Sequence, residues 1–203
     1  MKRKIVLLLL ILSVLIISFG CTKNLSKEEE YELLASSDVP VNTIKASFSI
    51  DTYNLQEVVG NTDYVFVAKV TAYKKTIFDT PSEIPETVYA VQVIENIKGE
   101  LIVNEEIELI KKGGLDKEYK YKYIFIDDIL PQVDNYYIFC TYALKSGEIR
   151  ASAQNSNLKI ENIRNLHEET NYLNILDAYE NQNVEYIRER YTSKYDKSNL
   201  KND

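Results

Sequence analysis

Few residues in this 203-residue sequence form a pattern that is typical of catalysis or metal binding. The only histidine is His167, which lies between Leu166 and Glu168. A single histidine excludes a multi-histidine metal site and the H-E-x-x-H motif. No nucleophile-elbow motif accompanies it. The sequence therefore predicts a solvated helix residue at this position, and no catalytic residue, metal site or cofactor.

Asp127 and Asp128 are the best candidates for carboxylate chemistry. Adjacent carboxylates can supply one side of a calcium site or an acid/base pair. No D-x-[DN]-x-[DN]-G loop surrounds them, and Pro131 follows closely. A turn before Pro131 is therefore favoured over a site, although an envelope enzyme that uses these carboxylates stays open as a hypothesis.

Tyrosine and lysine alternate over one short stretch: Tyr119, Lys120, Tyr121, Lys122 and Tyr123. Aromatic faces interleaved with cations can stack on sugars or bases. The bland alternative is structural, because lysines protect edge strands from pairing and tyrosines suit strands. The structural interpretation is favoured, and these five residues form the possible ligand surface of the chain.

The chain has two cysteines, Cys21 and Cys140. Cys140 lies in an apolar strand pattern between Phe139 and Thr141, where a thiol has a raised pKa and is inert. We therefore expect a core residue. Cys21 is better explained by the N-terminal segment, which leaves no intrachain disulfide.

The elements that position these residues follow an N-terminal signal. Basic residues at positions 2–4 precede an apolar run over 5–17 that ends at Ser18-Phe19-Gly20-Cys21. This order is typical of a signal peptide. The alternative is an uncleaved membrane helix, but the run is short of the roughly 20 residues that a span needs.

The four residues Ser18-Phe19-Gly20-Cys21 resemble the lipobox of bacterial lipoproteins. Gly20 and Cys21 match that pattern, while Ser18 stands where leucine is commoner. The resemblance implies cleavage between Gly20 and Cys21 and lipidation of the Cys21 thiol by diacylglyceryl and palmitate chains. Two acyl chains hold a protein stably at a membrane. We expect a lipid-anchored protein on the extracytoplasmic face of the cell membrane.

Cleavage makes the chain more acidic. The sequence has 24 basic residues, and the three at positions 2–4 are removed with the signal. The remaining 21 basic and 31 acidic residues give the mature chain a net charge of −10. This balance argues against nucleic acid as a partner and against a second, electrostatic attachment to anionic lipid.

Residues 21–43 are interpreted as a lipid-anchored tether. Ser26 and Glu29 fit a capping box, so a short helix is possible there, but a mobile spacer is preferred. Next, Asn54 can cap a helical turn that Gly60 ends in a left-handed conformation.

Period-two and β-branched patterns predict a series of strands. They cover 44–50, 63–73, 87–97, 106–112, 119–126, 135–144 and 149–153, with a short last strand at Leu158 and Ile160. Strands at close spacing without intervening helices favour a small antiparallel barrel.

Helical spacing then begins near Ile163 and continues to Tyr179, and a second helix is predicted from Val184 to Tyr191. The expected fold class is mainly β, a small antiparallel OB-like barrel followed by one or two α-helices. The expected domains are a signal peptide (1–20), the tether (21–43), the β-barrel (44–161), a C-terminal helical segment (162–192) and a polar, frayed tail (193–203).

Residues 55–161 resemble small exported bacterial domains with an oligonucleotide/oligosaccharide-binding-type barrel, themselves similar to the tissue inhibitors of metalloproteases and the netrin module. The matching pieces are 61–70, Tyr89-Ala90-Val91-Gln92-Val93, Ile97-Lys98-Gly99, Gly113-Gly114 and 136–139. The resemblance implies the fold. It does not imply protease inhibition, which needs a free N-terminal cysteine, whereas Cys21 is expected to carry lipid.

Three functions remain open. The leading hypothesis is a non-catalytic binding or adaptor module of the cell envelope, whose partner is a protein, a peptide or a glycan. The second is an immunity lipoprotein that sequesters a cationic, membrane-active peptide, which acidity and anchoring favour. The third is the envelope enzyme that uses Asp127 and Asp128.

Overall fold

The computed structural model describes residues 25–184 and 186–202. The expected signal peptide, its cleavage site and Cys21 lie outside the described residues. Within the described ranges, no helix is long and apolar enough to span a membrane.

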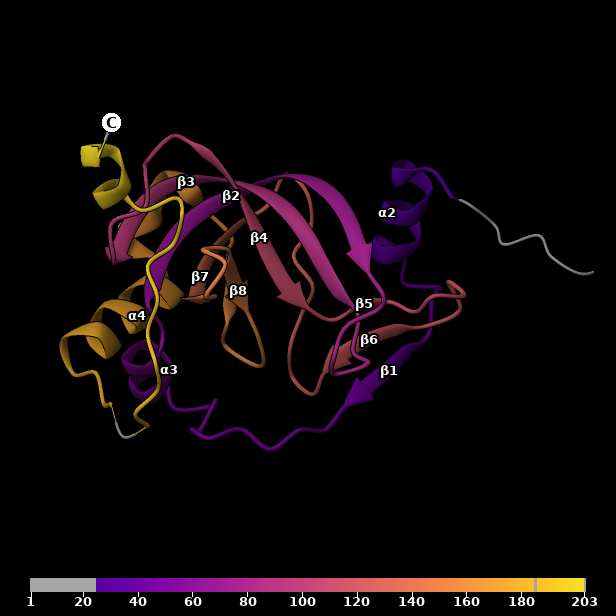
Figure 1. Ribbon diagram of the computed structural model, residues 1–203, viewed down its shortest axis with the longest axis horizontal. Helices are drawn as coiled ribbons and strands as arrows, with labels where there is room; N and C mark the ends of the chain where they lie inside the picture. Colours follow the sequence, from indigo (N-terminus) through magenta and orange to yellow (C-terminus); the bar gives the residue numbers. More distant parts are fainter. Residues whose placement is uncertain (1–24, 185, 203) are drawn as a thin grey trace, which may run out of the picture.

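The main sheet holds most of the strand residues. Its strands are β2 (Tyr64–Ile77), β3 (Glu86–Lys98), β4 (Glu106–Lys112), β7 (Tyr136–Ala143), β8 (Ile149–Ala151) and β9 (Asn157–Ile160). The order is β2-β3-β4-β8-β7-β9, and β2 also pairs with β7, so the pairing returns to its first strand. Figure 1 shows the strong curl of this sheet. The expectation of a mainly β fold with a C-terminal helix is confirmed. The sheet is not wholly antiparallel as expected, because β4 and β8 pair in parallel.

Strand β2 is apolar on both faces because both faces are covered. Phe66 and Phe139 belong to the cluster inside the curled sheet, with ring centroids 5.7 Å apart. Val65 and Val67 belong to a second cluster, which lies under the helices. Since neighbouring residues of a strand point to opposite faces, each residue of this run contributes to one core or the other.

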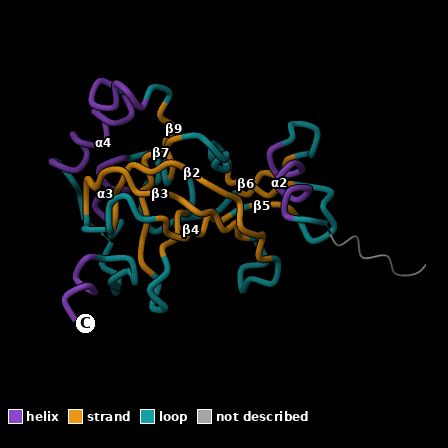
Figure 2. Tube along the Cα trace, turned by 90° about the horizontal axis from the view of Figure 1, so that it is seen from above, coloured by secondary structure: helices purple, strands orange, loops and turns teal. Residues whose placement is uncertain are grey.

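The helices over the second cluster are α3 (Leu55–Asn61), α4 (Thr170–Glu180) and the 3-10 helix η1 (Ile163–Glu168). Figure 2 shows α3 and α4 at the same end of the sheet. Asn54 caps α3 as predicted, since its side chain accepts a hydrogen bond from the Gln56 N–H. Gly60, however, lies inside α3 and does not end it. A Cβ at Gly60 would lie 1.9 Å from the Asn183 carbonyl oxygen, so close approach explains the glycine.

The other end of the molecule is built from α2 (Lys27–Ala35) and a small sheet of β1 (Val41–Ile44), β6 (Lys122–Phe125) and β5 (Gly114–Leu115). The capping box of α2 is present. Leu34 is buried, and the Tyr31 hydroxyl accepts a hydrogen bond from the Val133 N–H. The preferred mobile spacer is therefore wrong for residues 27–35, which form a docked helix.

Two predicted strands are shorter than expected. The strand predicted over 44–50 ends at Ile44. The strand predicted over 119–126 begins only at Lys122, because a turn precedes it. In this turn Tyr119 has a φ of 58°, and the Asp116 carboxylate accepts hydrogen bonds from the N–H groups of Lys120 and Tyr121.

The second C-terminal helix does not form. Residues 186–196, which we term the C-terminal strap, run back without helical structure past α3 toward β3 (Figure 1). Ser193 is fully buried, and its N–H donates to the Tyr64 hydroxyl. A short 3-10 helix, η2 (Lys197–Asn202), follows. The prediction of a frayed tail from residue 193 onward is therefore wrong for residues 193–196, which pack against the sheet.

Candidate functional site

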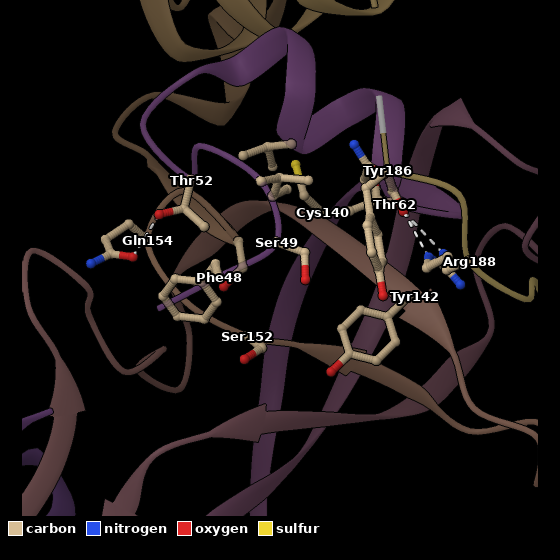
Figure 3. A pocket seen from close by; sticks show the side chains of 14 residues that line it. Phe48, Ser49, Thr52, Thr62, Cys140, Tyr142, Ser152, Gln154, Tyr186 and Arg188 are labelled. Atoms are coloured by element: carbon tan, nitrogen blue, oxygen red, sulfur yellow. Dashed lines mark hydrogen bonds between the residues drawn. The ribbon is translucent and has the colours of Figure 1, made fainter. Parts of the chain in front are cut away.

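A pocket of about 300 Å³ lies where α3, β7, the C-terminal strap and the loop before α3 meet. In Figure 3 the side chains of Phe48, Tyr142 and Tyr186 surround the space beside the Cys140 sulfur. Val58 and Cys140 are its buried apolar members. The full lining is Phe48, Ser49, Ile50, Thr52, Val58, Asn61, Thr62, Cys140, Tyr142, Ser152, Gln154, Ser156, Tyr186 and Arg188.

The pocket carries little net charge. Among the lining residues that the structure describes, Arg188 is the only charged one, and none is a carboxylate or a histidine. Arg188 is itself paired, with its guanidinium 2.6 Å from the Asp63 carboxylate. An apolar lining with a few polar groups is the usual character of a site for an uncharged ligand.

Cys140 lies in the core, as the sequence predicts, and is 2% exposed. Burial raises the pKa of its thiol to about 12. The thiolate is the nucleophilic form, so this side chain contributes apolar surface to the pocket and no reactive group.

The strap wall of the pocket is fixed to the end of α3. Lys98 Nζ lies 2.6 Å from the Val59 carbonyl, and Arg188 donates to the Asn61 carbonyl at 3.0 Å. Arg190 donates to the Thr62 carbonyl at 2.9 Å and pairs with Asp63. Cations thus satisfy the last carbonyl groups of the helix, where its dipole is negative.

The expected tyrosine and lysine surface is not a common face. Tyr119 is partly buried and donates its hydroxyl to Glu30, and Lys122 is 8% exposed with its ammonium group on backbone carbonyls of residues 34 and 36. Lys120 and Tyr121 are exposed in the turn, while Tyr123 is partly buried in β6. Because the stretch is half turn and half strand, its side chains do not alternate across one surface.

The two aspartates are also separated in their surroundings. Asp127 lies in the turn after β6 and accepts a hydrogen bond from the exposed Tyr53 hydroxyl. The Asp128 side chain is 2% exposed and pairs with Lys111 at 2.6 Å. The predicted turn before Pro131 is present, and the two carboxylates do not act as a pair.

Sequence reasoning missed the buried network around Lys111. Its Nζ donates to Asp128, to the Ser156 hydroxyl at 2.8 Å and to the Ala153 carbonyl at 3.4 Å. Burial lowers the pKa of Lys111 and raises the pKa of Asp128, while their attraction opposes both shifts. The alternation of Ile107 and Leu109 along β4 could have revealed it, since it places Lys111 on the same inward face.

Ser156 lines the pocket beside this network, but its hydroxyl is already committed. It accepts a hydrogen bond from the Lys111 ammonium group and donates to the Ala153 carbonyl at 2.7 Å. A catalytic serine needs an unprotonated base to accept its proton. Here the Ser156 hydroxyl donates its proton to a carbonyl oxygen, which is not such a base, so the arrangement is that of a structural network.

His167 lies in η1 with a side chain that is 70% exposed, 3.8 Å from the Glu95 carboxylate. The solvated position that the sequence predicts is confirmed. Among the residues placed by the structure, no group of three or more His, Cys, Asp or Glu side chains is arranged to hold a metal ion.

Comparison of the sequence with known protein families and with curated proteins found no match. The function must therefore be argued from the pocket and the sequence.

Proposed function

We propose that this protein is a lipoprotein of the extracytoplasmic membrane face, anchored through Cys21, that acts as a non-catalytic binding or adaptor module of the cell envelope. The observation that carries the proposal is the pocket. It is concave and largely apolar, and within the described part of the chain its lining offers no carboxylate or histidine to act as an acid or base. Such a lining suits retention of a ligand and not its conversion.

The two alternatives have less support. An immunity protein for a cationic peptide would place carboxylates at its site, and none stands among the lining residues described for residues 25–184 and 186–202. An enzyme built on Asp127 and Asp128 would need both carboxylates at one surface, whereas Asp128 is buried against Lys111.

Anchoring is tested by feeding an alkynyl palmitate analogue to cells that express the full chain. We expect labelled protein in the membrane fraction, and loss of both label and membrane association in Cys21→Ala. Cys140→Ala is the matched control and should keep its label, because the Cys140 thiol is buried. Equal labelling of Cys21→Ala would contradict the proposal.

Binding is tested in intact cells with a photo-crosslinking amino acid at position 152, on the pocket lining. The same amino acid at exposed Ser146, in the turn between β7 and β8, is the control. A specific product from position 152 alone, reduced when Cys21 is replaced, supports a membrane-positioned binding module. Identical products from both positions would count against the pocket.

A further inference from the structure

The segment that precedes α3 and contributes to the pocket lining has unpaired main-chain groups. Within the described chain, no backbone hydrogen bond joins residues 45–50 to another segment. Pairing stops with Ile44, whose carbonyl accepts from the Ile126 N–H, and resumes at Asp51, whose N–H donates to the Glu57 carboxylate. Figure 1 shows this segment running along the outer edge of the molecule between β1 and α3.

The segment is nevertheless held in place. The Phe48 ring packs edge-on against Phe125, with centroids 5.5 Å apart. Phe48, Ser49 and Ile50 also line the pocket. Strand addition uses free backbone donors and acceptors at a sheet edge, and this segment continues directly from the edge strand β1.

The pocket contains a polar atom that lacks a partner. Asn61 is 7% exposed, its Nδ2 donates to the Glu57 carbonyl, and its Oδ1 is buried without a hydrogen-bond partner in the described chain. A buried acceptor without a partner costs about 1–3 kcal/mol. An N–H group entering the pocket would satisfy it.

We propose, on the basis of the binding function proposed above, that the ligand is an extended peptide. Its backbone pairs with residues 45–50, and one bulky apolar side chain enters the pocket. The volume of about 300 Å³ is at the lower end for ligand sites, which suits one large side chain and adjoining backbone. Because Asp63 compensates Arg188, the pocket selects an uncharged side chain.

The first experiment selects random twelve-residue peptides displayed on phage against the full chain in lipid nanodiscs. We expect enriched sequences with Phe, Tyr, Leu or Ile among uncharged neighbours. Replacing that residue by alanine in the synthetic, acetylated and amidated peptide should weaken binding by about tenfold or more, as expected for a buried apolar side chain. Sequences rich in Lys and Arg would overturn the proposal.

Two variants locate the site. Ser152→Phe places a ring on the pocket lining and should weaken binding of the selected peptide by about tenfold or more, the loss expected when its anchor side chain is excluded. Ser146→Phe makes the same change at the exposed β7–β8 turn and should leave binding unchanged. Equal affinity of the two variants would place the peptide elsewhere and reject the proposal.

Hydrogen exchange separates strand addition from side-chain capture alone. We expect slower exchange of the amides of residues 45–50 in the peptide complex, and no slowing with the Ser152→Phe variant. Binding without protection there would overturn the pairing. If no peptide is selected while palmitate labelling and a position-152 crosslink to a glycan persist, the peptide proposal fails and the binding module stands.

Discussion

Lys111 and Asp128 form an ion pair whose side chains are 0% and 2% exposed. Removing one member leaves an uncompensated charge in the core, which typically costs 3–5 kcal/mol. We expect Lys111→Met and Asp128→Leu each to lower the free energy of unfolding by about this amount, and the double variant to lose clearly less than the sum. Urea denaturation of the three variants measures the coupling.

The exposed pair Lys117–Asp79, 3.2 Å apart, is the control for this cycle. Lys117→Met should change stability by about 0–1 kcal/mol, the range of surface ion pairs. If the buried single variants were as mild as the exposed one, the network would be open to water and would not be the buried pair described.

Lys98 makes the free energy of unfolding depend on pH. Burial lowers its pKa from 10.5 to about 8. Between pH 8 and 10 the unfolded chain therefore binds more protons at this site, so the Lys98 contribution to the free energy of unfolding rises with pH. Above pH 10 tyrosines oppose this trend, because burial raises the pKa of Tyr64 to about 12 while an unfolded tyrosine titrates near 10.

We expect the wild-type unfolding free energy to increase with pH more steeply than that of Lys98→Met over this interval. The slopes are compared, since the variant also loses its hydrogen bonds to α3 and starts from a different stability. Urea titrations at half-unit steps from pH 7.5 to 9.5 provide the slopes. Parallel curves would mean that Lys98 keeps an ordinary pKa.

At the scale of elements, helix α2 shows where local sequence is informative and where it is not. The capping box of Ser26 and Glu29 is visible in the sequence because its partners are three residues apart. The docking of the helix cannot be read from the local sequence, because its partners are distant. The Glu30 carboxylate accepts hydrogen bonds from the hydroxyls of Tyr73 and Tyr119. The helix therefore docks with Leu34 as its buried apolar residue, because these distant hydrogen bonds add to the packing.

Docking of α2 predicts the effect of truncating its buried leucine. Leu34 is 4% exposed, so Leu34→Ala should cost about 2–5 kcal/mol. Leu173→Ala, on α4 at a position that is 49% exposed, is the matched control and should cost much less. Thermal unfolding of both variants measures the difference, and equal losses would mean that α2 does not pack as described.

The strands could be predicted because their signal is local. β2, β3, β4 and β7 are dense in β-branched and aromatic residues, which is a property of the sequence itself. The segment from Val184 to Tyr191 has helical spacing in the sequence. Arg188 and Arg190 instead donate hydrogen bonds to backbone carbonyls of α3, about 130 residues away. The pocket was not predictable for the same reason, since its lining comes from five stretches of the chain: 48–52, 58–62, 140–142, 152–156 and 186–188.

At the scale of the whole molecule, the strap joins the helical end to the sheet. Its main contacts there are the Tyr64 hydroxyl with Ser193 and Asp196, and the Ile102 N–H with the Tyr195 carbonyl. Removing residues 186–203 should therefore lower the unfolding temperature more than removing residues 197–203 alone. Equal unfolding temperatures would show that the strap adds nothing to the stability of the sheet.

Under the proposed anchoring through Cys21, the docked helix α2 would also set how the molecule stands on a membrane. From Cys21 to Ser26 there are five residue steps, a reach of at most about 18 Å. With an acyl anchor on Cys21, this short tether would keep the α2 end facing the lipid. The helices α3 and α4 lie at the opposite end of the molecule in both views (Figures 1 and 2). The pocket beside α3 would then face away from the bilayer, toward ligands arriving from outside the cell surface.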